Sequence, residues 1–376
     1  MSNPLFKLKD FGQSVWYDDI TRSLVRDGGL QKLHDERAVV GVTTNPSIFE
    51  KAIGESEEYD EDLRKLSEGG ADPEQIFMDL ALDDVGRALD VLTETYEASD
   101  HLDGRVSMEV LASLAYDTER TQKMVRDIWA RVSKPNLMVK IPATTEGIPA
   151  IEQMLYEGHS INITLIFGLD YYRKVAEAYV SAVERRLDEG KPVQDLGSVA
   201  SFFVSRVDSK VDKMLDGLVE AGKLPADEAR SLKGRAAVAN ARLAYEVYRE
   251  IFHSDHFKAL EARGARVQRP LWASTGTKNP EYSDVLYIDE LVGPETVTTV
   301  PAKTLEAYAD HGKPAARIDQ GLEEARALMS QLEEVGIDMQ KVTDELLDEG
   351  VKTFEEAFEK LLNTIRAKVG GVTGKS

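Results

Sequence analysis

Short apolar runs recur eight times along the chain, and a stretch with helical spacing of its apolar residues follows each run. The run that begins at Leu137 mixes branched with other apolar residues, which favours a buried strand covered on both faces. The eight runs occupy residues 13–17, 39–43, 105–110, 137–142, 160–167, 198–204, 269–274 and 295–300. Regular alternation of strands with helices predicts a parallel sheet.

The stretches between the runs predict helices, some of them with clear start and stop signals. A helix predicted over residues 20–33 is interrupted by Gly28-Gly29, and Pro46 after Asn45 predicts the first turn of another. Proline suits that position because its missing N–H has no partner there in any case. The final Gly374-Lys375-Ser376 resembles the end of a phosphate-binding loop. Because no helix can follow it, we do not interpret it as a nucleotide site.

Eight strand–helix units without a linker predict a single (β/α)₈ TIM barrel domain over residues 1–376. The length implies additions to the barrel, and we expect a helical insertion at about 207–263 and a carboxyl-terminal helical extension from 302 to about 368. The Gly370-Gly371 tail is expected to be loose. An open, doubly wound sheet is the alternative fold, although no glycine-rich dinucleotide fingerprint follows any strand.

One lysine interrupts the fourth apolar run, in Leu137-Met-Val-Lys140-Ile-Pro142-Ala-Thr-Thr-Glu-Gly147. Pro142 cannot donate to the sheet and therefore marks the carboxyl end of the strand. Loss of water around a buried amine favours its neutral form, which can attack carbonyls and form a Schiff base. The alternative is a structural lysine held by a buried carboxylate.

Composition narrows the possible functions. The chain has 376 residues, no cysteine and a net charge of −21, which excludes disulfides and thiolate chemistry and argues against nucleic acid or an anionic membrane as partner. The amino terminus has no signal-like apolar core and no run is long enough to span a membrane, so we expect a cytoplasmic location. Of the six histidines, His253 and His256 are spaced for one helix face, but no third ligand is nearby, and no metal is expected.

Polar residues gather at the predicted carboxyl ends of the strands, where barrels carry their chemistry. Asp18 and Asn45 could instead cap the helices that follow them. Glu109 could simply be the structural ion partner of the strand lysine. The full set is Asp18, Thr43 to Asn45, Glu109, Lys140, Asn162, Thr164, Ser201 to Arg206 and Ser274 to Lys278.

Two segments resemble the signature motifs of transaldolases: Gly41-Val-Thr-Thr-Asn-Pro-Ser-Ile-Phe49 and the lysine segment 137–147. Weaker matches follow in the same order at residues 106–110, 160–164 and 201–206. The resemblance implies a (β/α)₈ barrel with the reactive lysine on the fourth strand. It also implies that Lys140 forms the imine and that Asp18 takes the proton of the substrate C4 hydroxyl.

Further roles are implied by the same resemblance. Glu109 would act as acid and base through a water that Thr164 orients. The residues implied in substrate binding are Asn45, Asn162, Ser201, Phe203, Arg206, Ser274 and Lys278. Among these, Arg206 resembles the main phosphate ligand, assisted by Ser274. Related fructose-6-phosphate aldolases have a tyrosine at the position of Phe203. The phenylalanine found here favours transfer of the three-carbon unit over release of free dihydroxyacetone.

The phosphate end departs from the family pattern. The familiar enzymes have an arginine two residues after the serine that matches Ser274, whereas Gly276 stands here and Lys278 follows it. Lys278 can supply charge but not a bidentate fork. From sequence alone, Arg206 and Lys278 could equally form surface ion pairs.

The implied reaction transfers a dihydroxyacetone unit from sedoheptulose 7-phosphate to glyceraldehyde 3-phosphate, without a cofactor. Sugar phosphates would be the partners, and a homo-oligomer is possible. Three alternatives stay open: a Schiff-base aldolase that releases dihydroxyacetone, a non-catalytic sugar-phosphate sensor, and a pyridoxal-phosphate enzyme. Against a sensor stands the intact set Asp18, Glu109, Lys140 and Thr164.

Overall fold

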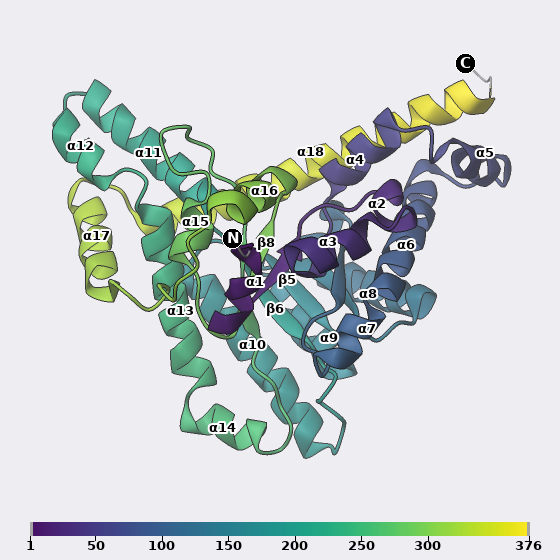
Figure 1. Cartoon of the computed structure of the whole chain (residues 1–376), viewed down its shortest axis with the longest axis horizontal. Helices are drawn as coiled ribbons and strands as arrows, with labels where there is room; N and C mark the ends of the chain where they lie inside the picture. Colours follow the sequence, from purple (N-terminus) through teal and green to yellow (C-terminus); the bar gives the residue numbers. More distant parts are fainter. Residues whose placement is uncertain (1–2, 374–376) are drawn as a thin grey trace.

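The computed structural model describes residues 3–373, in which eight parallel strands close into one barrel in the order β1 to β8 (Figure 1). This closure confirms the predicted (β/α)₈ barrel and excludes the open sheet. The strands are β1 (Gln13–Tyr17), β2 (Val39–Thr43), β3 (Arg105–Glu109), β4 (Leu137–Pro142), β5 (Ile161–Ile166), β6 (Ser198–Phe203), β7 (Arg269–Ala273) and β8 (Thr296–Val300).

Helices surround the barrel and extend beyond it (Figure 1). The first group is α1 (Leu5–Leu8), η1 (Lys9–Phe11), α2 (Arg22–Arg26), α3 (Gly29–Arg37), α4 (Pro46–Glu55), α5 (Asp60–Glu68), α6 (Pro73–Val91), α7 (Thr93–Ala98), η2 (Ala112–Leu114) and α8 (Thr118–Val132). The second is α9 (Gly147–Glu157), α10 (Leu169–Asp188), α11 (Ser205–Glu220), α12 (Ala226–Leu232), α13 (Ala236–Phe252), α14 (Asp255–Glu261), α15 (Leu286–Glu290), α16 (Ala302–His311), α17 (Leu322–Glu334) and α18 (Met339–Thr373).

The predicted strands are confirmed to within one residue at each end, and the chain after β6 forms the helices α11 to α14. The helix predicted over 20–33 is two helices, because Gly28 adopts a left-handed backbone (φ 75°) that separates α2 from α3. The prediction of a loose Gly370-Gly371 tail is wrong, since both glycines belong to α18. Gly374-Lys375-Ser376 lies outside the described residues.

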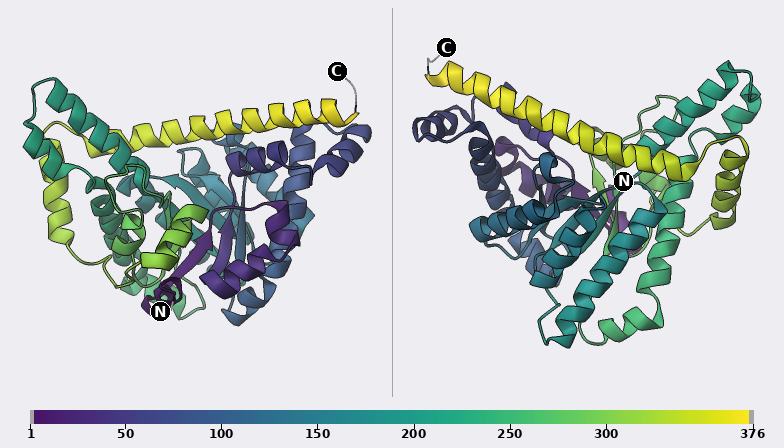
Figure 2. Two further views of the ribbon diagram at one scale, coloured as in Figure 1. Left: turned by 45° about the horizontal axis from the view of Figure 1, so that its top comes forward. Right: turned by 180° about the vertical axis from the view of Figure 1, so that it is seen from behind.

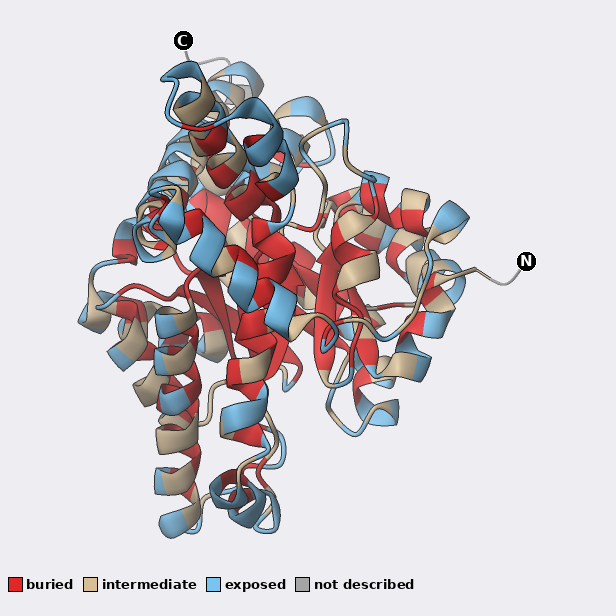
Figure 3. Cartoon of the chain, turned by 90° about the vertical axis from the view of Figure 1, so that its left-hand side faces the viewer, coloured by how far each residue is buried: buried red, intermediate tan, exposed pale blue. Residues whose placement is uncertain are grey.

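The barrel strands are buried on both faces, as their composition predicts (Figure 3). Parallel pairing places Glu109 of β3 beside Lys140 of β4, and Lys140 beside Asn162 of β5. Three polar side chains from neighbouring strands therefore meet near the carboxyl end of the barrel. Within residues 3–373, no helix is both long and apolar enough to cross a membrane.

Helix α18 is a 35-residue rod that crosses the carboxyl-terminal side of the barrel, from beside α11 to beside α4 and α5 (Figure 2). Ion pairs fix both halves of the rod. Lys210 of α11 contacts Glu345 and Glu349, each at 2.7 Å, and Lys368 contacts Asp60 of α5 at 2.9 Å. Helix α18 is thus bound near both of its ends to helices that lie around the carboxyl-terminal side of the barrel.

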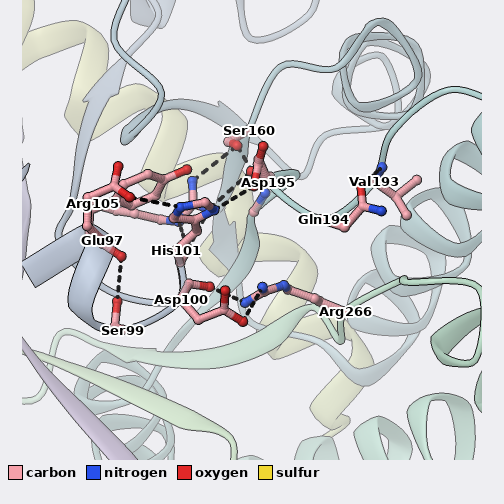
Figure 4. A network of polar contacts seen from close by, with 12 residues as sticks. Glu97, Ser99, Asp100, His101, Arg105, Ser160, Val193, Gln194, Asp195 and Arg266 are labelled. Atoms are coloured by element: carbon pink, nitrogen blue, oxygen red, sulfur yellow. Dashed lines mark hydrogen bonds and ion pairs between the residues drawn. The ribbon is translucent and has the colours of Figure 1, made fainter.

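A polar network centred on Arg105 lies at the amino-terminal end of β3, on the opposite side of the barrel (Figure 4). The buried guanidinium donates to the carbonyl of His101 at 2.8 Å, to that of Asp195 at 3.2 Å and to Ser160 Oγ at 3.2 Å. Burial lowers the pKa of Arg105 to about 10. Because this end of a barrel commonly serves stability rather than chemistry, we assign the network a structural role.

Arg105→Met is expected to lower the free energy of unfolding by about 2–4 kcal/mol, because the partly buried carbonyls of His101 and Asp195 and the buried Ser160 hydroxyl lose their donor. Urea unfolding measures this change, and turnover of the folded variant should stay close to that of the parent. The matched control is Arg126→Met, which removes an exposed ion pair with Glu157 and should cost less than about 1 kcal/mol. Equal losses in both variants would contradict the assignment.

Candidate active site

Lys140 and Glu109 form a buried ion pair at the carboxyl end of the barrel. Their side chains are 7% and 9% exposed, and the Lys140 ammonium contacts both a Glu109 carboxylate oxygen and the Thr44 carbonyl, the latter at 2.9 Å. Burial raises the pKa of Glu109, although the charge of Lys140 opposes the rise. Glu109 is therefore both the ion partner of Lys140 and a base placed to accept its proton.

Lys140 also lines a cavity of about 230 Å³. Most of the predicted site residues share this cavity. Besides Lys140, its walls contain Asp18, Asn45, Thr164, Ser201, Phe203, Arg206, Ser274 and Lys278 from the predicted set, together with Thr43, Thr44, Ala273, Gly276, Thr299, Pro301 and Phe354. Glu109 and Asn162 do not line the cavity themselves but are the neighbours of Lys140 on the adjacent strands β3 and β5.

Asp18 follows the last residue of β1, and its backbone N–H extends the strand by donating to the Val300 carbonyl at 3.2 Å. Burial raises the pKa of Asp18 to about 7; the charge of Lys140 opposes the rise and that of Asp19 adds to it. A carboxyl group with such a pKa can give and take a proton near neutral pH. This property suits a general acid–base residue better than a helix cap.

Thr164 is presented by an irregularity in β5. Residues 164 and 165 together oppose a single residue of β6, and Leu165 has a left-handed backbone with φ 59°. A non-glycine residue in that region is strained, and such strain is concentrated at functional sites. The Thr164 hydroxyl is buried and has no hydrogen-bond partner within residues 3–373. It is therefore available to a water or a substrate in the cavity.

Asn162 is held inside the barrel by two hydroxyl groups. Its amide nitrogen donates to Ser107 Oγ at 3.0 Å, and Ser201 Oγ donates to its amide oxygen at 2.7 Å. Ser201 reaches the cavity, whereas Asn162 is fully buried beneath it. A direct contact between Asn162 and substrate remains a prediction, and the structure links this residue to the cavity through Ser201.

Asn45 both caps a helix and lines the cavity. Its side-chain oxygen accepts from the backbone N–H of Ile48 at 3.1 Å, which makes it the N-cap of α4, with Pro46 in the first turn. The amide nitrogen of Asn45 is not used by the cap. One side chain thus serves the helix with its oxygen and can offer its NH₂ group to a ligand.

Two positively charged side chains, Arg206 and Lys278, also line the cavity. Arg206 lies in the first turn of α11 and Lys278 in the loop after β7, and neither side chain has an ion-pair partner within the described chain. Burial lowers the pKa of Arg206. Ser274 lines the cavity as well, and its hydroxyl lies 2.8 Å from Ser205 Oγ. These groups supply the local basic cluster that a phosphate ester requires.

Two residues of the site were missed as functional candidates: Ser107, which accepts a hydrogen bond from Asn162, and Phe354 of α18, which lines the cavity. Thr44 was among the candidates without a role of its own; its carbonyl accepts from Lys140, and its hydroxyl donates to Glu109 at 3.2 Å. Ser107 lies within the two-residue alternation of a strand already predicted, which was the available signal. No local pattern indicates that Phe354 reaches the site. Within residues 3–373, no cluster of three or more metal-binding side chains is found.

A buried lysine beside a carboxylate, facing a cavity at the carboxyl ends of the strands of a (β/α)₈ barrel, is typical of enzymes that form Schiff bases with carbonyl substrates. Comparison with known proteins narrows this class. Residues 15–365 match the model of the family "Transaldolase/Fructose-6-phosphate aldolase". The chain belongs to this family, which confirms the resemblance found in the motifs.

Curated relatives agree with the family match. A protein named transaldolase from Parafrankia sp. (strain EAN1pec) is 48% identical over 98% of this chain and 99% of its own length. Transaldolases of Frankia alni and of Mycobacterium tuberculosis (strain H37Rv) are each 48% identical, over 98% of both chains and 97% of both chains, respectively. The similarity thus includes the insertion and the carboxyl-terminal extension.

Proposed function

We propose that the chain catalyses transaldolase transfer of a dihydroxyacetone unit from sedoheptulose 7-phosphate to glyceraldehyde 3-phosphate. The products are erythrose 4-phosphate and fructose 6-phosphate. The observation that carries this proposal is the composition of one cavity: the Lys140 amine and the Asp18 carboxyl line it together with Arg206 and Lys278, which form no ion pair within residues 3–373. A phosphorylated ketose matches both kinds of group.

In the first half-reaction, Glu109 accepts a proton from Lys140, and the free amine attacks the ketose C2. Loss of the C2 oxygen as water, protonated with the help of Glu109 and a water held by Thr164, gives a protonated imine. Asp18 then takes the proton of the C4 hydroxyl. The C3–C4 bond breaks, its electrons pass to the imine, and erythrose 4-phosphate leaves.

In the second half-reaction, the enamine carbon attacks the aldehyde carbon of glyceraldehyde 3-phosphate. Asp18 returns its proton to the new hydroxyl, and addition of water to the imine releases fructose 6-phosphate and the lysine amine. Because burial raises the pKa of Asp18 to about 7, the same group can serve as base and then as acid. Arg206 and Lys278 bind the phosphate of donor and acceptor alike.

The acceptor requirement tests this function. With fructose 6-phosphate as donor, we expect turnover to depend on erythrose 4-phosphate, and little dihydroxyacetone to form without it. Phe203 supports this expectation, since its ring cannot hydrogen-bond a water at the position where related aldolases have a tyrosine. Comparable turnover without the acceptor would identify an aldolase instead. A cytoplasmic location and a homo-oligomer stay predictions.

A further inference from the structure

Helix α18 contributes directly to the cavity through one side chain. Phe354 lines the cavity together with Lys140, Thr164 and Phe203, and it is the only lining residue that comes from beyond α16 in the described chain. Its ring is partly buried against the core. The long helix that crosses the carboxyl-terminal side of the barrel (Figure 2) therefore adds an aromatic side chain to a cavity that Phe203 also lines.

Close packing one turn earlier fixes the position of Phe354. Gly350 of α18 is buried against β5, and a methyl group at this position would lie 3.0 Å from Leu165 Cδ2 and 3.6 Å from Phe167 Cε2. Leu165 is the left-handed residue next to Thr164, and the Phe167 ring packs on that of Phe203 at 5.2 Å between centroids. The helix thus rests on β5, which presents Thr164, and on Phe167, whose ring packs against Phe203.

Ion pairs hold the same part of α18 to α11. Lys210 of α11 contacts Glu345 and Glu349, while Arg206 lies one turn earlier in α11. The negative charge of Glu349 faces Arg206 as well. The part of α18 that carries Phe354 therefore packs against β5, which carries Thr164, and pairs with α11, which carries Arg206.

On this geometry, and resting on the proposed transaldolase chemistry, we propose that Phe354 is a water-excluding residue that determines whether the enamine is transferred or released. The enamine has two outcomes. Attack of its carbon on an aldehyde completes transfer. Protonation of that carbon by water, followed by addition of water to the imine, splits fructose 6-phosphate into dihydroxyacetone and glyceraldehyde 3-phosphate. An apolar ring over the cavity disfavours the second outcome because it keeps water from the carbanion.

The test is the ratio of dihydroxyacetone release to transfer, measured with fructose 6-phosphate and erythrose 4-phosphate. Phe354→Ala is expected to raise this ratio roughly five- to tenfold, and Phe354→Leu to raise it less. The control is Lys352→Ala on the same helix, whose side chain is 76% exposed and which should leave the ratio unchanged. If Phe354→Ala does not fold, Phe354→Leu takes its place: a release-to-transfer ratio above that of the parent supports the role of Phe354, and an unchanged ratio contradicts it.

Borohydride trapping of the Lys140 adduct separates this inference from the proposed function. A parent protein without transfer or adduct would refute the proposed function itself. A parent that transfers, together with Phe354 variants that form the adduct at an unchanged release-to-transfer ratio, would overturn only the role of Phe354. An increase of the ratio in Lys352→Ala as well would also overturn it, since the effect would then belong to the helix in general.

Discussion

Lys140→Ala is expected to lower kcat by about 10⁴-fold or more, because without the amine no imine forms and the breaking C3–C4 bond loses its electron sink. Lys140→Arg should be equally inactive, since a guanidinium keeps the charge beside Glu109 but cannot form an imine with a ketose. A coupled assay of glyceraldehyde 3-phosphate production measures both variants. Lys123→Ala, which removes an exposed lysine paired with Asp127, is the matched control and should keep full turnover.

The arginine variant makes this test selective. If Lys140 served only as the structural ion partner of Glu109, Lys140→Arg would retain much of the activity. Retention of more than about one-tenth of kcat in that variant would therefore favour the structural interpretation over the covalent one.

Asp18→Asn is expected to lower kcat/KM by about 10²–10⁴-fold, the range typical for loss of a general acid–base group. In the parent, kcat/KM should rise with pH through about 7, because the base must be ionised and burial raises the pKa of Asp18 to about 7. The asparagine variant should lose this rise. A rate–pH profile of each protein gives the result, and a variant with the same inflection as the parent would show that another group is the base.

The same pKa shift predicts an effect on stability. The pKa of Asp18 is raised in the folded chain, so the folded state favours the neutral acid, and the stability that depends on this proton is lost as the pH rises through about 7. The loss begins near the ordinary pKa of 3.8 and is complete above about 7, so the stability of Asp18→Asn should gain on that of the parent by about 2–3 kcal/mol between pH 5 and pH 8. A variant without this relative gain would contradict the burial of this charge.

Much of the fold could be predicted because its signals are local. Most strands contain β-branched residues, and Pro142 ends β4 where the proline predicts it. Parallel pairing then brings Glu109, Lys140 and Asn162 together without further information, since the carboxyl ends of barrel strands meet at one side. The polar residues at these ends could be recognised for the same reason.

Other features depend on contacts between distant segments and leave no local pattern. The path of α18 over the barrel follows from packing at Gly350 and from its ion pairs with α11 and α5, so Phe354 could not be placed from its neighbours in sequence. Helix α18 also continues through Gly370 and Gly371, where propensity alone indicates an end. The bulge at Leu165 is likewise hidden, because leucine gives no hint of a left-handed backbone.

The most direct test of the covalent mechanism is borohydride reduction of the protein in the presence of fructose 6-phosphate, followed by peptide mapping. We expect one stable adduct, located on Lys140, with loss of activity in proportion to labelling. An adduct on any other residue, or no adduct in a protein that still turns over the sugar, would contradict the central role of this lysine.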